Sequence, residues 1–185
     1  MKISEIDFGD NTAFKDCVLA TGCEEAEDVV KLICRDKKLT SIEGLEQFPN
    51  LKLLDVTRNR LEELDVSKNP LLEELFAGNN NLQSLDLSNN PNLTHLEVFI
   101  NELSSLNIGS NALLEELYAN KNEIAEIDLG NNPELVDLRL SDNELEEINL
   151  TSNKKLEKLY LENNQFSKQY ISEFRETQQV EDLKI

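Results

Sequence analysis

Residues 135–145 read LVDLRLSDNEL, and this stretch decides the fold. Its residues follow the pattern L-x-x-L-x-L-x-x-N-x-L, in which the central L-x-L triplet has the two-residue period of a β-strand. Both leucines of the triplet therefore point to one side, and the residue between them points to the other. A strand this short is unstable alone, so the pattern predicts neighbours that repeat it and share one core.

The pattern recurs along most of the chain at a spacing that alternates between ten and eleven residues. The period is therefore 21 residues, with a second half-repeat nested inside each repeat. The half-repeats begin at Leu51, Leu61, Leu72, Leu82, Leu93, Leu103, Leu114, Ile124, Leu135, Leu145 and Leu156. They end at Asn59, Asn69, Asn80, Asn90, Asn101, Asn111, Asn122, Asn132, Asn143, Asn153 and Asn164. This repetition accounts for the 32 leucines and 22 asparagines of the chain.

These half-repeats resemble the leucine-rich repeat family. The second halves are similar to a bacterial class that reads LDLS-x-N, as in LDVS at 64–67 and LDLS at 85–88. The resemblance covers roughly residues 29–166, and the period lies within the range of the family. It implies a leucine-rich repeat solenoid, an α/β-type horseshoe or coil made mostly of short parallel β-strands.

The physics of stacking supports the same fold. Each repeat pairs its strand with the next and buries a continuous column of leucine, while the asparagines satisfy backbone groups in the turns. Because the two half-repeats nearly match, we expect short parallel strands on both flanks of the coil. Half-repeats of ten or eleven residues leave no room for a helix on the convex side.

The ends of the chain depart from the repeat, as capping units do. We expect a single domain with a helical N-terminal cap at residues 1–28, about six repeats at 29–166, and a C-terminal cap at 167–185. In the first cap, residues 11–20 have helical spacing. In the last, a helix capped by Ser167 presents Ile171 and Phe174 and is followed by a strand within 180–185.

Composition excludes several function classes. The chain has 37 acidic and 18 basic residues, a net charge of −19 and a pI near 4.4, which disfavours binding to nucleic acid or an anionic membrane. Cys17, Cys23 and Cys34 are odd in number and confined to the first fifth of the chain, unlike a secreted disulfide framework. With no targeting segment visible near Met1, we expect a reduced, cytoplasmic protein.

One set of outward positions varies from repeat to repeat, and we predict the binding site there. The second half-repeats are monotonous at these positions, with only Asp or Asn, as a structural element would be. The first half-repeats carry aromatic and charged residues, which are typical of a protein-binding patch. The predicted protein-binding residues are Phe76, His95, Glu97, Phe99, Tyr118, Lys121, Arg139 and Tyr160. The alternative is that Phe76 and Phe99 pack on each other and only stabilise the sheet.

Catalytic, metal and cofactor sites find no support in the sequence. His95 is the only histidine, and neither a nucleophile elbow nor a phosphate-binding glycine loop is present. The three cysteines lack the paired spacing of a zinc site. A column of outward Asp and Asn side chains could bind calcium through its oxygen atoms. We favour the interpretation that these side chains form a ladder that stays hydrated and binds no metal. Its members are Asp65, Asp86, Asn107, Asp128 and Asn149.

The sequence therefore indicates a non-enzymatic module that binds a protein partner and needs no cofactor. The acidic charge favours a basic partner. By analogy with acidic leucine-rich inhibitors, our narrower hypothesis is a monomeric cytoplasmic inhibitor or immunity-type protein that masks a basic toxin or nuclease. The alternative is a cell-surface or secreted adhesion or scaffold module.

Overall fold

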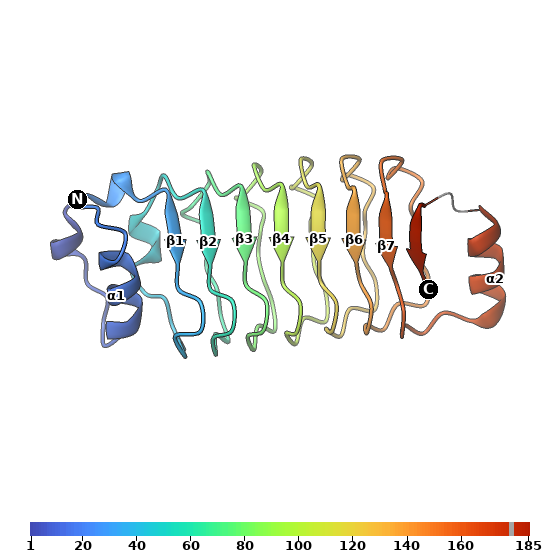
Figure 1. Ribbon diagram of the computed structural model, residues 1–185, viewed down its shortest axis with the longest axis horizontal. Helices are drawn as coiled ribbons and strands as arrows, with labels where there is room; N and C mark the ends of the chain where they lie inside the picture. Colours follow the sequence, from blue (N-terminus) through green and yellow to red (C-terminus); the bar gives the residue numbers. More distant parts are fainter. Residues whose placement is uncertain (178–179) are drawn as a thin grey trace.

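The repeats form one continuous solenoid. The computed structural model describes residues 1–177 and 180–185. Figure 1 shows the strands standing side by side along the long axis, with helix α1 (Thr12–Leu19) at one end and helix α2 (Lys168–Thr177) at the other. In the part of the chain that is described, no helix is long and apolar enough to cross a membrane.

The strands form a single parallel sheet in chain order. Each has three residues, and neighbouring strands pair with an offset close to the sequence period; for example, Leu75 pairs with Leu96 and Leu96 with Leu117. The six strands β2–β7 come from the full repeats, β1 from a degenerate first repeat and β8 from the C-terminal cap. The strands are β1 (Lys31–Ile33), β2 (Leu53–Asp55), β3 (Glu74–Phe76), β4 (His95–Glu97), β5 (Glu116–Tyr118), β6 (Asp137–Arg139), β7 (Lys158–Tyr160) and β8 (Asp182–Lys184). The predicted parallel-strand solenoid is confirmed.

The core is the expected leucine column. The central leucine of each strand from β1 to β7 is fully buried, and the second half-repeats contribute the facing wall, for example Leu87 and Ile108. Each strand alone buries little apolar surface, so the free energy of folding comes from stacking one repeat on the next.

The expectation of strands on both flanks is wrong: in the described residues the second half-repeats form no strand. Local turns hold the backbone of these half-repeats instead. In each, the Oδ1 atom of the outward Asp or Asn accepts a hydrogen bond from the backbone N–H two residues later, as from Ser67 to Asp65 at 2.8 Å and from Gly109 to Asn107 at 3.0 Å. The bond competes with strand pairing but does not exclude it, since Asp55 at the end of β2 accepts the same bond from Thr57. The monotony of these positions is therefore structural.

The asparagines that end the first half-repeats form a fully bonded ladder, which we call the first-half ladder. Oδ1 of Asn122 accepts from the backbone N–H of Leu103, and its Nδ2 donates to the carbonyls of Val98 and Ala119. The Ala119 carbonyl also accepts from Asn143, so successive asparagines share acceptors along the solenoid. The members are Asn59, Asn80, Asn101, Asn122, Asn143 and Asn164.

The asparagines of the second half-repeats are bonded differently, and we call them the second-half ladder. Nδ2 of Asn132 donates to the carbonyls of Ile108 and Asn111 in the preceding repeat. Its Oδ1 is buried and has no hydrogen-bond partner among the described residues, and the same holds for the other members. The members are Asn69, Asn90, Asn111, Asn132 and Asn153.

The N-terminal cap closes one end of the core. Asn11 caps helix α1, its Oδ1 accepting from the N–H of Phe14, and the helix buries Phe14, Cys17 and Val18, whereas Leu19 points to solvent. Three short 3₁₀ turns complete this end and the first repeat. They are η1 (Ile3–Glu5), η2 (Ala26–Asp28) and η3 (Leu45–Gln47).

The C-terminal cap covers the other end of the core with aromatic rings. Ser167 Oγ accepts from the N–H of Tyr170, as expected of a helix cap. Rings of Phe166, Tyr170 and Phe174 stack in sequence, and Tyr170 rather than Ile171 packs with Phe174 against the core. The helix phase explains this difference, because residues four apart share one helix face. Residues 178–179 of the expected cap at 167–185 lie outside the described residues.

A left-handed residue follows each of the strands β2–β7 at the same position of the repeat. Its backbone φ lies between 53° and 59°, and the position is occupied by Arg58, Asn79, Ile100, Lys121, Asp142 and Asn163. Asparagine and aspartate tolerate this conformation, whereas a β-branched residue such as Ile100 does so only under strain.

We therefore expect Ile100→Asn to raise the free energy of unfolding by about 1 kcal/mol. Ile100 is 40% exposed, so little burial is lost with its side chain. Urea denaturation measures the change, and Asn79→Ile is the reciprocal control, expected to destabilise by a similar amount. Equal stability of all three proteins would show that the left-handed turn carries no strain.

Candidate functional site

The outward side chains of β3–β7, with Phe99 just beyond β4, form the surface that we call the sheet face. Most of these side chains are half-buried, which means that they contact one another while keeping a solvent-exposed side. They come from successive repeats, because the parallel register places equivalent positions next to each other. The sheet face consists of Glu74, Phe76, His95, Glu97, Phe99, Glu116, Tyr118, Asp137, Arg139, Lys158 and Tyr160.

A row of rings crosses β3, β4 and β5. The ring centroids of Phe76 and His95 are 4.9 Å apart, and those of His95 and Tyr118 are 5.3 Å apart in an edge-to-face arrangement. These contacts run diagonally across the sheet, because the register pairs Phe76 with Glu97 rather than with His95. His95 is thus the centre of an aromatic row.

Glu97 lies among these rings. Its neighbours across the sheet are Phe76 and Tyr118, and its neighbours two residues away along the chain are His95 and Phe99. The side chain is only 21% exposed, and Oε1 lies 3.2 Å from His95 Nε2. Among the described residues, His95 is the only ion-pair partner of this carboxylate, and only when it is protonated.

Carboxylates from three strands set the protonation of His95. Its Nδ1 lies 3.5 Å from Glu116 Oε2, on the side opposite to the Glu97 contact. Burial lowers its pKa, the hydrogen bond with Glu97 raises it, and the charges of Glu116, Glu97 and Glu74 raise it further. The net result is a pKa of His95 above its ordinary value.

Arg139 organises the other half of the sheet face. Its guanidinium lies 4.1 Å from the ring centroid of Tyr118 and 5.3 Å from that of Tyr160. It also forms two hydrogen bonds to the carboxylate of Asp137, at 3.0 and 2.9 Å, and Lys158 approaches the same carboxylate at 3.3 Å. The cation therefore joins two tyrosines and a buried acid from three consecutive strands.

In the β5–β8 half of the sheet face, the acidic side chains are paired with basic side chains or hydroxyl groups of the same surface. Burial raises the pKa of Asp137, but the bonds and charges of Arg139 and Lys158 outweigh it and hold that pKa below its usual range. Burial and the hydrogen bond to Glu116, at 2.6 Å, raise the pKa of the Tyr118 hydroxyl. The Tyr160 hydroxyl donates a hydrogen bond to Asp182. The Nζ atom of Lys184 lies over the Tyr160 ring, 4.3 Å from its centroid.

Phe99 and Lys121 lie apart from these two groups. The Phe99 ring lies directly over Gly78, so closely that a Cβ atom at that glycine would come within 2.6 Å of it. Phe99 therefore packs on backbone, and in the described residues Phe76 has its ring contact with His95 instead of Phe99. Lys121 is exposed in the left-handed turn after β5, and in the described chain its amine has no hydrogen bond or ion pair.

The remaining candidates behave as structural residues. Cys17 and Cys34 are buried and Cys23 is half-buried, and all three are free thiols. The backbone N–H groups of Ser67 and Ser88 lower the pKa of Asp65 and Asp86, which are the turn-forming residues described above. Within residues 1–177 and 180–185, no group of three or more His, Cys, Asp or Glu side chains is placed to hold a metal ion.

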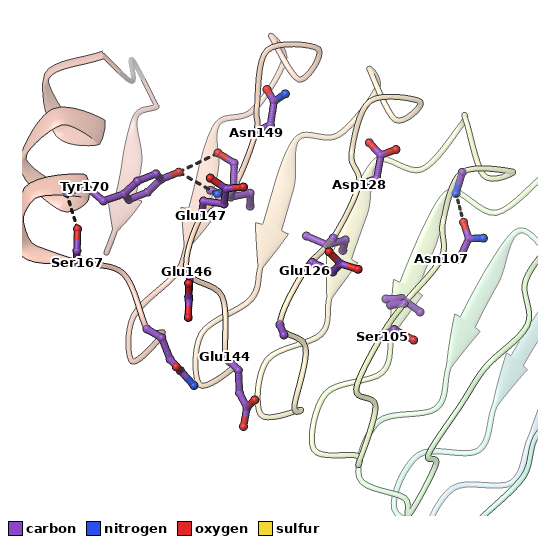
Figure 2. A pocket seen from close by; sticks show the side chains of 16 residues that line it. Ser105, Asn107, Glu126, Asp128, Glu144, Glu146, Glu147, Asn149, Ser167 and Tyr170 are labelled. Carbon is purple, nitrogen blue, oxygen red and sulfur yellow. Dashed lines mark hydrogen bonds between the residues drawn. The ribbon is translucent and has the colours of Figure 1, made fainter.

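One surface feature was missed from the sequence. An open groove of about 1380 Å³ lies on the second flank, between the last second half-repeats and α2. Figure 2 shows Tyr170 reaching across its end, where the hydroxyl bonds to both the N–H and the carbonyl of Ile148 at 2.9 Å. Five carboxylates line it: Glu126, Asp128, Glu144, Glu146 and Glu147. The repeat pattern does not place α2, so the groove could not be found from spacing.

The comparisons with known proteins agree with this fold. The Leucine Rich Repeat family profile matches residues 81–106 and 155–176. A search of curated proteins found no match. Among solved structures, 218 chains match, and three of them are from one bacterium.

All three come from Listeria monocytogenes. The functional domain of InlJ, which includes a cysteine ladder, matches 90% of this chain with 21% identity and a TM-score of 0.60. The internalin InlF matches 70% of this chain with 26% identity and a TM-score of 0.67. The internalin InlC2 matches 84% with 20% identity and a TM-score of 0.66.

The chain spans less than half of the InlJ and InlF structures, 48% and 40% of their lengths, and 85% of the InlC2 structure. The repeat pattern, the parallel sheet and the matched profile together define its class of fold: the chain forms a leucine-rich repeat solenoid. Its solenoid has the fold found in bacterial internalins.

Proposed function

We propose that the chain is a non-enzymatic protein-binding module and that the sheet face is its binding surface. The observation that carries the proposal is the Tyr118–Arg139–Tyr160 stack on the outside of the sheet. Folding of the repeat needs only the inward leucines and the asparagine ladders, so it does not require aromatic and arginine residues at these outward positions. Tyr and Arg are the residues enriched at the energetic centres of protein interfaces.

The narrower proposal concerns the partner. A net charge of −19 attracts a basic protein and speeds its association at low salt. We infer a monomeric, cytoplasmic inhibitor or immunity-type protein that masks a basic toxin or nuclease. Leucine-rich inhibitors with acidic surfaces are the analogy behind this step.

The binding surface is tested by the double substitution Tyr118→Ala/Arg139→Ala. We expect it to weaken binding of the partner at least about 100-fold, because it removes two central anchors of the stack, while the protein stays folded. The partner is first captured from the native cells, identified by mass spectrometry and purified, and its affinity is then measured by calorimetry.

The control substitution is Glu146→Ala/Glu147→Ala in the groove of Figure 2. Both glutamates are exposed, so the protein keeps its stability, and binding is expected to stay within about twofold. If the control loses the partner and the Tyr118/Arg139 variant retains it, the groove rather than the sheet face is the binding surface.

The alternative proposal is a cell-surface or secreted adhesion or scaffold module, which the fold similarity to the internalins favours. Fractionation of the native cells separates the two. Recovery of the protein from the cytoplasm, next to a gene for a basic toxin, supports the inhibitor. Recovery from the envelope or medium, with a processed N-terminus upstream of Met1, supports the adhesion module and overturns the cytoplasmic assignment.

A further inference from the structure

The two halves of the sheet face differ in how their charges are satisfied. In the β5–β8 half, Arg139 and Lys158 neutralise Asp137, and the pair is shielded by tyrosine rings. In the β3–β5 half, the described residues provide no Lys or Arg partner for Glu74 or Glu97. Arg35, on the side of β1, is bonded to Asp55, with Nε at 3.0 Å from its carboxylate, and it interacts with the charge of Glu97 only at longer range, without an ion pair.

The unmatched half combines charge with aromatic rings. Glu97 is half-buried with the rings of Phe76, Phe99 and Tyr118 as neighbours, so its charge is partly removed from water. A cation placed beside a carboxylate and against ring faces gains both an ion pair and cation–π attraction. The Arg139 stack on Tyr118 shows the same combination within this chain, one strand further along the sheet.

We propose that the β3–β5 half of the sheet face receives an arginine or lysine side chain of the partner, which pairs with Glu97 beside the ring of Phe76, and that His95 competes with this cation through its proton. The inference rests on the proposed function, since it places the partner on the same surface. It adds the chemistry of the contact and a dependence on pH.

The competition follows from the position of His95. Its ring faces Glu74 on β3, Glu97 on its own strand, and Glu116 and Tyr118 on β5. When His95 is protonated, it supplies the positive charge that Glu97 otherwise lacks. A bound cation next to Glu97 repels that proton, so binding lowers the pKa of His95 and releases a proton wherever the ring is protonated in the free protein. By linkage, affinity must rise with pH through this titration, by at most about tenfold per pH unit for one proton.

The test uses a small probe in place of the partner. N-acetyl-arginine amide is titrated into the protein, and the ring signals of His95 are followed by NMR across the pH range. N-acetyl-citrulline amide, which has a similar shape but no charge, is the matched ligand control. The variants are Glu97→Gln, His95→Gln and, on the second flank, the exposed Glu126→Gln.

We expect the arginine amide to lower the pKa of His95 and to shift the ring signals of Phe76, whereas the citrulline amide does neither. Glu97→Gln should abolish both effects, Glu126→Gln should preserve them, and His95→Gln should bind the probe with an affinity that no longer changes with pH across the range in which His95 titrates in the native protein. An unchanged pKa of His95 at saturating probe, an equal response to citrulline, or full binding by folded Glu97→Gln would each overturn the proposal.

Failure of the cation site and failure of the proposed function give different results. A probe that binds at Glu97 while the natural partner tolerates Tyr118→Ala/Arg139→Ala would support the cation site and reject the larger binding surface. A partner that is lost with Tyr118→Ala/Arg139→Ala but shows no dependence on Glu97 would support the surface and reject the cation site.

Discussion

Asn122→Ala is expected to lower the free energy of unfolding by about 3–4 kcal/mol. The substitution removes two hydrogen bonds donated to carbonyls and leaves the buried N–H of Leu103 without its acceptor. Lost bonds cost about 1 kcal/mol each, and an unsatisfied buried donor costs about 1–3 kcal/mol more. Urea denaturation followed by circular dichroism measures the loss.

Asn132→Ala in the second-half ladder is the matched control, expected to cost about 2 kcal/mol, because it removes two donated hydrogen bonds and orphans no backbone N–H. In both variants the carbonyls keep other donors: Val98 O also accepts from Asn101 and Ala119 O from Asn143, while Ile108 O accepts from the N–H of Asn111 and Asn111 O from that of Leu114. The two variants therefore differ in the buried N–H of Leu103, which, among the described residues, Asn122 alone serves. Asn132→Ala also removes the Oδ1 atom that has no partner in the described chain. A cost for Asn132→Ala equal to or above that of Asn122→Ala would show that the two ladders are equivalent.

Phe14→Ala should destabilise the protein by about 4 kcal/mol, because its ring is fully buried and closes the end of the leucine column. The ring packs edge-on against Phe8, with centroids 5.9 Å apart, so its loss leaves a cavity beneath α1. Terminal caps protect the first repeat of a solenoid from solvent, and the effect therefore extends to the neighbouring strand.

Thermal unfolding and hydrogen exchange of β1 measure both consequences. Phe76→Ala is the control, since its ring is only half-buried on the sheet face, and it should cost about 1 kcal/mol. If Phe14→Ala proved as mild as Phe76→Ala, the N-terminal cap would not stabilise the array.

Most of the fold could be predicted because the same local sequence pattern recurs in every repeat. The inward leucines, the turn asparagines and the helical N-terminal cap were all confirmed. The prediction of strands on the second flank failed at Asp65 and its equivalents. Their apolar pattern matches that of a strand, but a side-chain bond to the backbone two residues later competes with strand pairing.

The variable residues of the candidate site were also named from spacing, yet their contacts were not. Period and register place Phe76, Glu97 and Tyr118 side by side on one row. They do not say that His95 joins the rings diagonally, nor that Arg139 folds onto Tyr118 rather than into solvent. Those choices depend on side-chain rotamers and on competing partners such as Asp137.

The sequence by itself determined the solenoid, its period and the face that varies, because a two-residue alternation repeated every 21 residues admits one way of burying its leucines. Only the tertiary structure decided which charges on that face are already neutralised. Charge pairing is a property of side chains brought together from different repeats. Within the described residues, Asp137 forms ion pairs with Arg139 and Lys158, whereas Glu97, two strands away, has His95 as its ion-pair partner.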